Sequence, residues 1–196
     1  MGIKKLRRTV KGILPDWEIE RLCTEVDPPM ITPFIKEKTG YPSRGLSSYG
    51  YDIALGNTFL VPKENVLLDP LNVKEEDWLR LWVDDGEGFI IQPHQHVLAE
   101  SVEYFHMPED VMGLCYGKST WARLGLIVHA TPVESRWAGR LTVELHNASP
   151  NPIRVYVGCG IAQIIFIRGA FPPKAGYDAR GGRYQNQLGV TLPKRS

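Results

Sequence analysis

A carboxylate, a hydroxyl and two cations lie in two neighbouring segments of the chain, and their types point to hydrolysis. The four residues are Lys118, Ser119, Arg123 and Glu144. Glu144 falls in RLTVELHN at 140–147, where alternation predicts a strand with Leu141, Val143 and Leu145 on one face. A proton-transferring carboxylate near a hydroxyl and anion-binding cations is typical of a hydrolytic site. The structural alternatives are a solvated carboxylate, a capping serine and a surface salt bridge.

The segment GKSTWARLG at 117–125 resembles the end of a phosphate-binding P-loop, but its spacing excludes that motif. A P-loop needs a glycine at position 112, where this chain has Met112, and Gly113 is one residue out of register. The β-branched run LIVHAT follows too soon for a long helix. We expect Ser119 to be the N-cap of a short turn over 119–124, whose free N–H groups favour a phosphate.

The five histidines do not form a zinc motif. The sequence contains neither H-E-x-x-H nor the H-x-E and P-C-x-x-C signature of the zinc nucleobase deaminases. We therefore interpret His94 and His96 as loop or strand-edge residues, and His129 and His146 as polar packing residues. We expect Glu144 to carry out general acid–base catalysis, and we expect no zinc.

Short strands separated by Gly, Pro, Asn and Asp account for most of the chain. One short helix is predicted over 16–26, with Trp17, Leu22 and Val26 near one face. Residues 75–83 are either a second short helix or a helical turn that runs into a strand. The expected strands are 51–55, 57–61, 88–92, 96–105, 111–116, 126–131, 140–147, 152–157 and 161–167. This pattern predicts a sandwich, jelly roll or small barrel.

The chain length and the charge balance indicate one domain without a large excess of positive or negative charge. The chain has 196 residues, and its 23 basic and 22 acidic residues give a net charge of +1, which does not favour nucleic acid or a membrane surface. Three cysteines without CxxC spacing suit free thiols in the cytoplasm. We expect no secretory signal, because the basic N-terminus carries no apolar segment of the usual length, and Leu6 stands where a myristoylation motif needs Ser or Thr. The longest apolar run, 161–167, is too short to span a membrane.

The C-terminal stretch, from about 172 to 196, is polar and rich in glycine. Such a composition predicts either a disordered tail or a flexible arm that orders over a ligand. The side chains that suit an arm are Tyr177, Arg180, Arg183, Tyr184 and Gln187.

Taken together, these segments resemble the dCTP deaminases, which are relatives of the trimeric dUTPases. The core of the resemblance is GKSTWARLGLIVHATPVESRWAGRLTVELHN, and the supporting segments are 46–59, 101–111, 160–166 and 180–194. The match runs from about Leu14 to the C-terminus and is loosest over 62–88. The resemblance implies a distorted β-barrel or jelly-roll subunit in a homotrimer, with active sites assembled between neighbouring subunits.

The resemblance also implies an activity, the hydrolysis of dCTP to dUTP and ammonia, with magnesium held by the triphosphate. Glu144 then matches the general base and acid, and Ser119 and Arg123 match the other catalytic positions. The implied substrate-binding residues are Lys118, Ser119, Thr120, Arg123, Glu134, Thr142, Tyr177, Arg183 and Gln187. Lys118 and the three tail residues match phosphate contacts, Glu134 lies near the sugar, and Thr142 near the base.

One carboxylate can serve both proton transfers if its pKa lies nearer neutrality than that of a free glutamate. Burial would raise the pKa of Glu144, and the charge of Arg123 would lower it. Ser119 and a backbone carbonyl would hold the attacking water in place of zinc.

Two segments depart from the family pattern. This chain has ESRWAG, with Ser135, Arg136 and Ala138, where relatives usually read EPEWEG near the sugar. It also has Leu188 where the tail motif Q-x-Q-R-G carries an arginine, which puts one phosphate contact implied by the resemblance in doubt.

Three other functions remain as alternatives. A plain dUTPase is disfavoured, because Glu134 and Trp137 replace the aspartate and tyrosine of its motif. A bifunctional enzyme that forms dUMP shares the same core elements. A non-catalytic trimer should lack Ser119, Arg123 or Glu144, and all three are present. The family also suggests feedback inhibition by dTTP, with residues 129–130 as a hinge.

Overall fold

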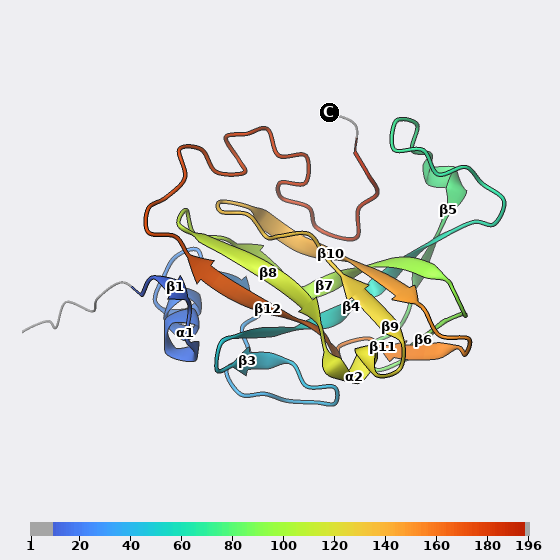
Figure 1. Cartoon of the computed structure of the whole chain (residues 1–196), viewed down its shortest axis with the longest axis horizontal. Coiled ribbons are helices and arrows are strands. Elements are labelled where there is room, and N and C mark those ends of the chain that lie inside the picture. Colours follow the sequence, from blue (N-terminus) through green and yellow to red (C-terminus); the bar gives the residue numbers. More distant parts are fainter. Residues whose placement is uncertain (1–9, 195–196) are drawn as a thin grey trace, which may run out of the picture.

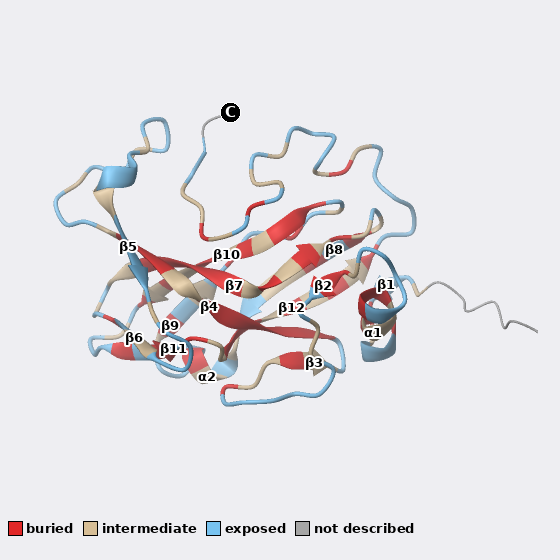
Figure 2. Cartoon of the chain, turned by 180° about the vertical axis from the view of Figure 1, so that it is seen from behind, coloured by how far each residue is buried: buried red, intermediate tan, exposed pale blue. Residues whose placement is uncertain are grey.

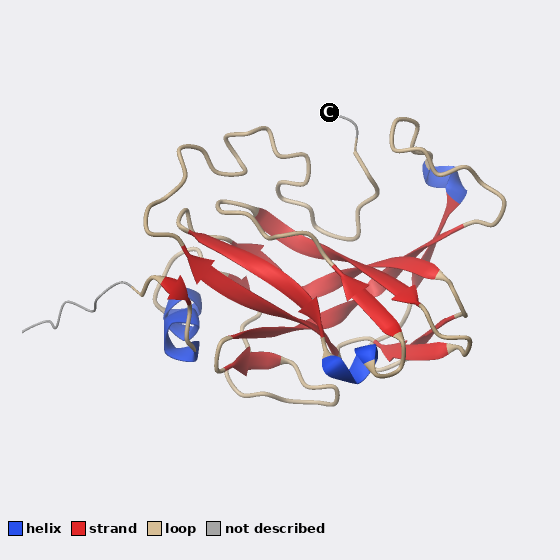
Figure 3. Ribbon diagram, in the orientation of Figure 1, coloured by secondary structure: helices blue, strands red, loops and turns tan. Residues whose placement is uncertain are grey.

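The protein is mainly β, as the sequence predicts (Figure 3). The computed structural model describes residues 10–194, so the expectations about Leu6 and the N-terminal leader lie outside the described residues. The helical segments are α1 (Asp16–Thr24), the 3-10 turn η1 (Glu75–Asp77) and α2 (Ser119–Ala122).

The strands include every segment that the sequence predicts, and the first two predicted segments merge into one long strand. The strands are β1 (Gly12–Ile13), β2 (Ile31–Thr32), β3 (Gly45–Ser47), β4 (Gly50–Pro62), β5 (Trp78–Trp82), β6 (Gly88–Ile91), β7 (His96–His106), β8 (Val111–Gly117), β9 (Leu126–His129), β10 (Ala138–Asn147), β11 (Ile153–Tyr156) and β12 (Gly160–Arg168). Residues 75–83 follow the second alternative, because η1 leads directly into β5.

Ten strands form one antiparallel sheet that curls, and β4 connects its two parts (Figure 1). The first residues of β4 pair with β12, whereas its later residues pair with β5 and β7. The path through the sheet is β1-β12-β4-β7-β10-β9, and β6 and β11 form a separate ribbon. Strand β10 therefore lies between β7 and β9, and both neighbours contribute residues around Glu144.

The alternation predicted for residues 140–147 is confirmed. Leu141, Val143 and Leu145 are buried, whereas Thr142 and Glu144 are only partly buried on the opposite face. Figure 2 shows that the central strands carry most of the buried residues, and that the loop before β5 and the C-terminal segment are largely exposed. The core fixes the backbone of β10, and the polar face of that strand is left for a site.

The helix prediction is wrong in two details. Helix α1 ends at Thr24 instead of residue 26, since Pro28 disfavours helical backbone in the residue before it. Its buried apolar residues, Ile19, Leu22 and Cys23, follow helical spacing. Trp17 is exposed because it lies on the opposite side of the helix, and Val26 is exposed beyond the end of the helix.

The three cysteines are free thiols, as expected. Burial raises the pKa of Cys23 and of Cys115 to about 12, so neither is a ready nucleophile. Within residues 10–194, no helix is long and apolar enough to cross a membrane.

Candidate active site

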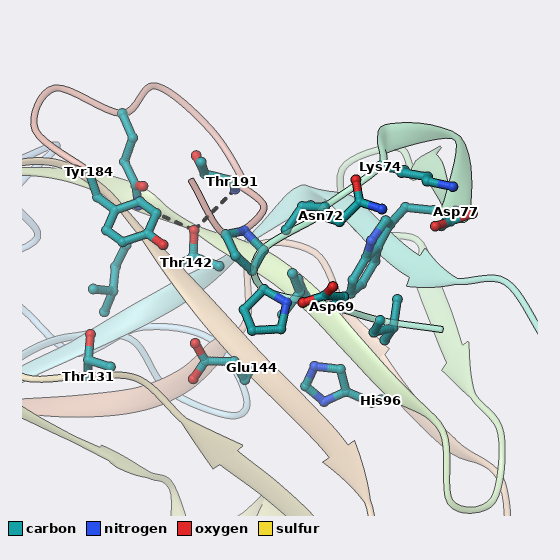
Figure 4. Close-up of a pocket in the computed structure, with 18 of the residues that line it drawn as sticks. Asp69, Asn72, Lys74, Asp77, His96, Thr131, Thr142, Glu144, Tyr184 and Thr191 are labelled. Atoms are coloured by element: carbon teal, nitrogen blue, oxygen red, sulfur yellow. Dashed lines mark hydrogen bonds between the residues drawn. The ribbon is translucent and has the colours of Figure 1, made fainter. Parts of the chain in front are cut away.

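A cavity of about 460 Å³ lies along the polar face of β10 and contains the predicted acid–base residue (Figure 4). Five of the predicted site residues line it: Glu134, Thr142, Glu144, Tyr177 and Gln187. The structure thus brings the proposed proton carrier together with the expected sugar and base contacts and with two residues of the C-terminal segment.

Glu144 projects into this cavity from the middle of β10. It pairs across the strands with His129 of β9 and Leu98 of β7. Its Oε2 atom is buried and has no hydrogen-bond partner among residues 10–194. Burial raises the pKa of the Glu144 carboxyl, and the charge of His129 partly opposes that rise. The opposing charge expected from Arg123 is therefore supplied by His129 within the protomer.

The C-terminal arm, residues 172–194, packs against β10 beside the cavity. The N–H of Asn186 donates to the carbonyl of Ala138 at 2.7 Å, and the N–H of Arg140 donates to that of Gln187 at 2.8 Å. Val190 is buried against β4 and β7. These contacts favour the arm interpretation over a dispensable tail.

The hydroxyl of Thr142 contributes to the docking of the arm. It accepts from Gln187 Nε2 at 3.3 Å and from the N–H of Thr191 at 3.3 Å, as the dashed lines in Figure 4 show. Gln187 Nε2 also donates to the carbonyl of Arg140 at 2.6 Å, whereas its Oε1 is buried without a partner among the described residues. The predicted base contact and one predicted phosphate contact thus hold the arm to β10.

The predicted residues of α2 lie in a different hollow of the same protomer. Ser119, Thr120 and Arg123 line it together with Arg154. Figure 1 shows α2 at the lower edge of the molecule and the arm at the upper edge. The side chains of Arg123 and Arg154 have no ion-pair or hydrogen-bond partner between residues 10 and 194. A single protomer therefore does not bring Ser119 and Arg123 to Glu144.

The prediction that Ser119 is an N-cap is wrong. Lys118 is the N-cap of α2, and its carbonyl accepts the N–H groups of Trp121 at 3.0 Å and Ala122 at 3.1 Å. Ser119 is the first helical residue, because the extended backbone already ends at Lys118. The Ser119 hydroxyl is consequently not used for capping.

Three cations that the sequence singled out lie outside the cavity. The Lys118 ammonium lies 2.5 Å from the carboxylate of Asp52, a buried residue of β4 that the sequence analysis missed. Arg183 donates to the carbonyl of Lys194 at 3.4 Å, and Arg180 donates to that of Ala175 at 3.1 Å. The only sequence signal for Asp52 is its position as a charged residue inside the apolar run YDIAL.

Comparisons with known proteins identify the family of this chain. The family described as dCTP deaminase-like matches residues 13–169, which is most of the chain. The chain belongs to the dCTP deaminase-like family. It is 42% identical over 187 residues to the dCTP deaminase of Anaplasma phagocytophilum (strain HZ), covering 93% of this chain and 98% of that relative. It is also 42% identical over 186 residues to the dCTP deaminase of Helicobacter pylori (strain Shi470), with the same coverage of 93% and 98%.

A solved structure shows the same fold. The 2'-deoxycytidine 5'-triphosphate deaminase of Agrobacterium tumefaciens superposes with a TM-score of 0.59 at 20% sequence identity, covering 81% of this chain. The aligned region is 48% of that solved chain, so this protein corresponds to about half of its length.

Two of the residues at which this chain departs from the family pattern contact the arm, Arg136 through its side chain and Ser135 through its main-chain carbonyl. The carbonyl of Ser135 accepts the N–H of Tyr177 at 3.0 Å, and Arg136 lies 2.8 Å from Glu109 and 3.6 Å from Asp178. Leu188, which replaces the tail arginine, is 77% exposed.

The cavity also contains residues that the sequence analysis did not assign to it. His96 begins β7 and lines the cavity, and burial together with the nearby His146 lowers its pKa. Residues from 67 to 78 complete the wall, in the region where resemblance to dCTP deaminases is loosest. In the described part of the chain, no cluster of three or more His, Cys, Asp or Glu side chains is arranged to hold a metal ion.

Proposed function

We propose that this protein is a dCTP deaminase that hydrolyses dCTP to dUTP and ammonia. The observation that carries the proposal is Glu144, whose buried, unpartnered Oε2 lies in the cavity and whose pKa is raised. Membership of the dCTP deaminase-like family supports the choice of substrate.

The proposed reaction uses Glu144 twice. The carboxylate takes a proton from the water that attacks C4 of cytosine and delivers it to N3. It then takes the proton of the new C4 hydroxyl and delivers it to the amino group, so that the C–N bond breaks and ammonia leaves. A pKa nearer neutrality than that of a free glutamate suits a group that both accepts and donates a proton.

The proposed active site is shared between subunits of a homotrimer. Ser119 and Arg123 lie in a different hollow from Glu144, and both can meet that residue if a neighbouring subunit supplies α2. In such a site, Ser119 and a backbone carbonyl orient the water without zinc, and Arg123 presents a guanidinium to an anion.

The substrate in this proposal is dCTP with magnesium bound to its triphosphate. Glu134 and Thr142 line the cavity beside Glu144, which supports their assignment to the sugar and the base. The proposed phosphate contacts are Lys118, Tyr177, Arg183 and Gln187, and Thr120 is proposed as a further substrate-binding residue. Inhibition by dTTP and a cytoplasmic location stay predictions.

The test is to incubate purified protein with Mg–dCTP and to separate dUTP from dUMP and pyrophosphate over time. We expect dUTP as the first product, whereas dUMP as the first product would support the bifunctional alternative. Glu144→Gln should lower kcat by roughly 10²–10⁴-fold while dCTP binding is retained. Glu64→Gln, at an exposed position outside both hollows, is the control and should turn over normally. Undiminished ammonia release by the Glu144 variant would contradict the mechanism.

A further inference from the structure

Two lysines share one oxygen of a buried carboxylate. The Asp52 side chain is 1% exposed, and its Oδ2 lies 2.5 Å from Lys118 Nζ and 2.8 Å from Lys38 Nζ. Its Oδ1 accepts from Gln163 Nε2 at 3.0 Å. One negative charge is therefore paired with two positive charges, one more than its neutralisation needs.

The two lysines come from different elements. Lys118 immediately precedes α2, whereas Lys38 lies in the connection between β2 and β3, a hairpin that the bridge between Thr39 and Arg44 closes. This hairpin is held tightly against β12, since the N–H of Gly160 donates to the carbonyl of Pro42 at 2.8 Å. A Cβ atom at Gly160 would lie 1.9 Å from the carbonyl oxygen of Ser43, so only glycine allows this approach. The position of Lys38 is thus set by the fold.

The second ion pair changes what Lys118 is able to do. If Lys118 alone neutralised Asp52, turning its ammonium to a phosphate would leave a buried carboxylate without a counter-ion, which is strongly unfavourable. With Lys38 on the same oxygen, the carboxylate keeps a cation and the hydrogen bond from Gln163. Lys118 then becomes available to a second anion at much lower cost.

We propose that Lys38 is a positioning residue, which keeps Asp52 neutralised while Lys118 turns to the triphosphate of the substrate. The inference rests on the proposed function, in which Lys118 is a phosphate contact. In this proposal Lys38 contacts neither the cytosine nor Glu144 and acts only through Asp52 and Lys118.

The first test is Lys38→Met, measured by steady-state deamination of dCTP. Without Lys38, Asp52 holds Lys118 more tightly, so the KM for dCTP should rise by about fivefold while kcat stays within about twofold. Lys38→Arg keeps the charge and should restore the KM. The matched control is Lys36→Met in the same hairpin, because Lys36 pairs with Glu20 on the surface and should leave the KM unchanged.

A double-mutant cycle with Lys118→Met distinguishes the inference from the function on which it rests. We expect Lys118→Met to raise the KM and Lys38→Met to add nothing in that background. If Lys118→Met leaves the KM unchanged, the phosphate role of Lys118 fails and the inference fails with it. If Lys118→Met raises the KM but Lys38→Met does not, only the inference is overturned.

Two further results would also overturn it. The same rise in KM from Lys38→Met in both backgrounds would show that Lys38 acts on the phosphate directly. A lower melting temperature for both Lys38→Met and Lys38→Gln with an unchanged KM would show a purely structural role.

Discussion

The ionisation of Glu144 reflects two opposing features of its surroundings, burial in the cavity and the imidazole of His129 across the strand pair. Burial raises the pKa of Glu144, and His129 lowers it. Because the proposed mechanism starts from the carboxylate, kcat/KM should fall as the pH drops through this raised pKa.

Replacing His129 with Gln should therefore shift the acid limb of the activity profile to higher pH. The variant keeps a polar side chain but removes the charge that stabilises the carboxylate, so the pKa of Glu144 rises further. The measurement is kcat/KM against pH for the wild type and the variant. His94→Gln, in the turn before β7, is the control and should not move the limb. An acid limb that stays in place in the His129 variant would contradict this account.

A second buried carboxyl group affects stability instead of catalysis. Burial raises the pKa of Glu103 from 4.5 to about 7, and both of its oxygens accept from the N–H of Ala54. The native state therefore holds this proton over a pH range in which the unfolded chain has lost it. The stability gained in this way is fully present below pH 4.5 and is lost as the pH rises through about 7.

Glu103→Gln should weaken that pH dependence, because the amide keeps an acceptor for Ala54 but does not ionise. Urea denaturation at pH 5 and pH 8 gives the free energy of unfolding for the wild type and the variant. These two pH values bracket the Glu103 pKa of about 7. We expect the free energy of unfolding to decrease less between them in the variant than in the wild type. An equal loss in both proteins would show that Glu103 is not the group responsible.

The sequence could locate Glu144, because alternation along one strand depends only on neighbouring residues. It could not locate Asp52 or Glu103, since charged residues in apolar strands are buried only when distant elements cover them. The influence of His129 on Glu144 depends on which strand lies beside β10. That pairing is set by the whole sheet and not by the local pattern.

At the scale of elements, the arm is a part of the site that has neither a helix nor a regular strand. It is attached by hydrogen bonds to β10, by hydrogen bonds to Ser135 and Trp137 just before that strand, and by the burial of Val190. Of the departures from the family pattern, Arg136 adds a side-chain contact to the first part of the arm, its 3.6 Å ion pair with Asp178. Substrate binding and folding should therefore respond differently when the arm is removed.

A chain that ends at Tyr184 should fold but bind dCTP poorly. The strands of the core remain intact, whereas Gln187, Thr191 and Pro193 no longer line the cavity. We expect the KM to rise by at least about tenfold with a small decrease in melting temperature. Leu188→Ala, which changes an exposed side chain of the arm, is the control and should leave both unchanged. An unaltered KM in the shortened chain would show that the arm takes no part in binding.

The sequence predicted the long strands correctly, because a long run of residues shows its alternation or its apolar character clearly. Strands such as β7, β10 and β12 have enough alternating or apolar residues to be recognised, whereas the two-residue strands β1 and β2 have no detectable period. The buried face of α1 was misjudged, because the largest apolar residues were chosen instead of those with helical spacing.

At the scale of the whole molecule, the two hollows in one protomer are the central feature. The resemblance predicted sites between subunits. The structure adds that Glu144 and α2 line two separate hollows of one protomer. We therefore propose that each active site takes Glu144 from one subunit and Arg123 from another.

Mixing two inactive variants tests this claim most directly. Glu144→Gln and Arg123→Ala should each be nearly inactive alone, and their chains should form mixed trimers after denaturation together and refolding. Random assembly of equal amounts places an intact Glu144 beside an intact Arg123 in about a quarter of the sites of a cyclic trimer. We predict recovery of about a quarter of the wild-type deamination rate. If mixed trimers form and no activity returns, each site is built within one subunit and the account is contradicted.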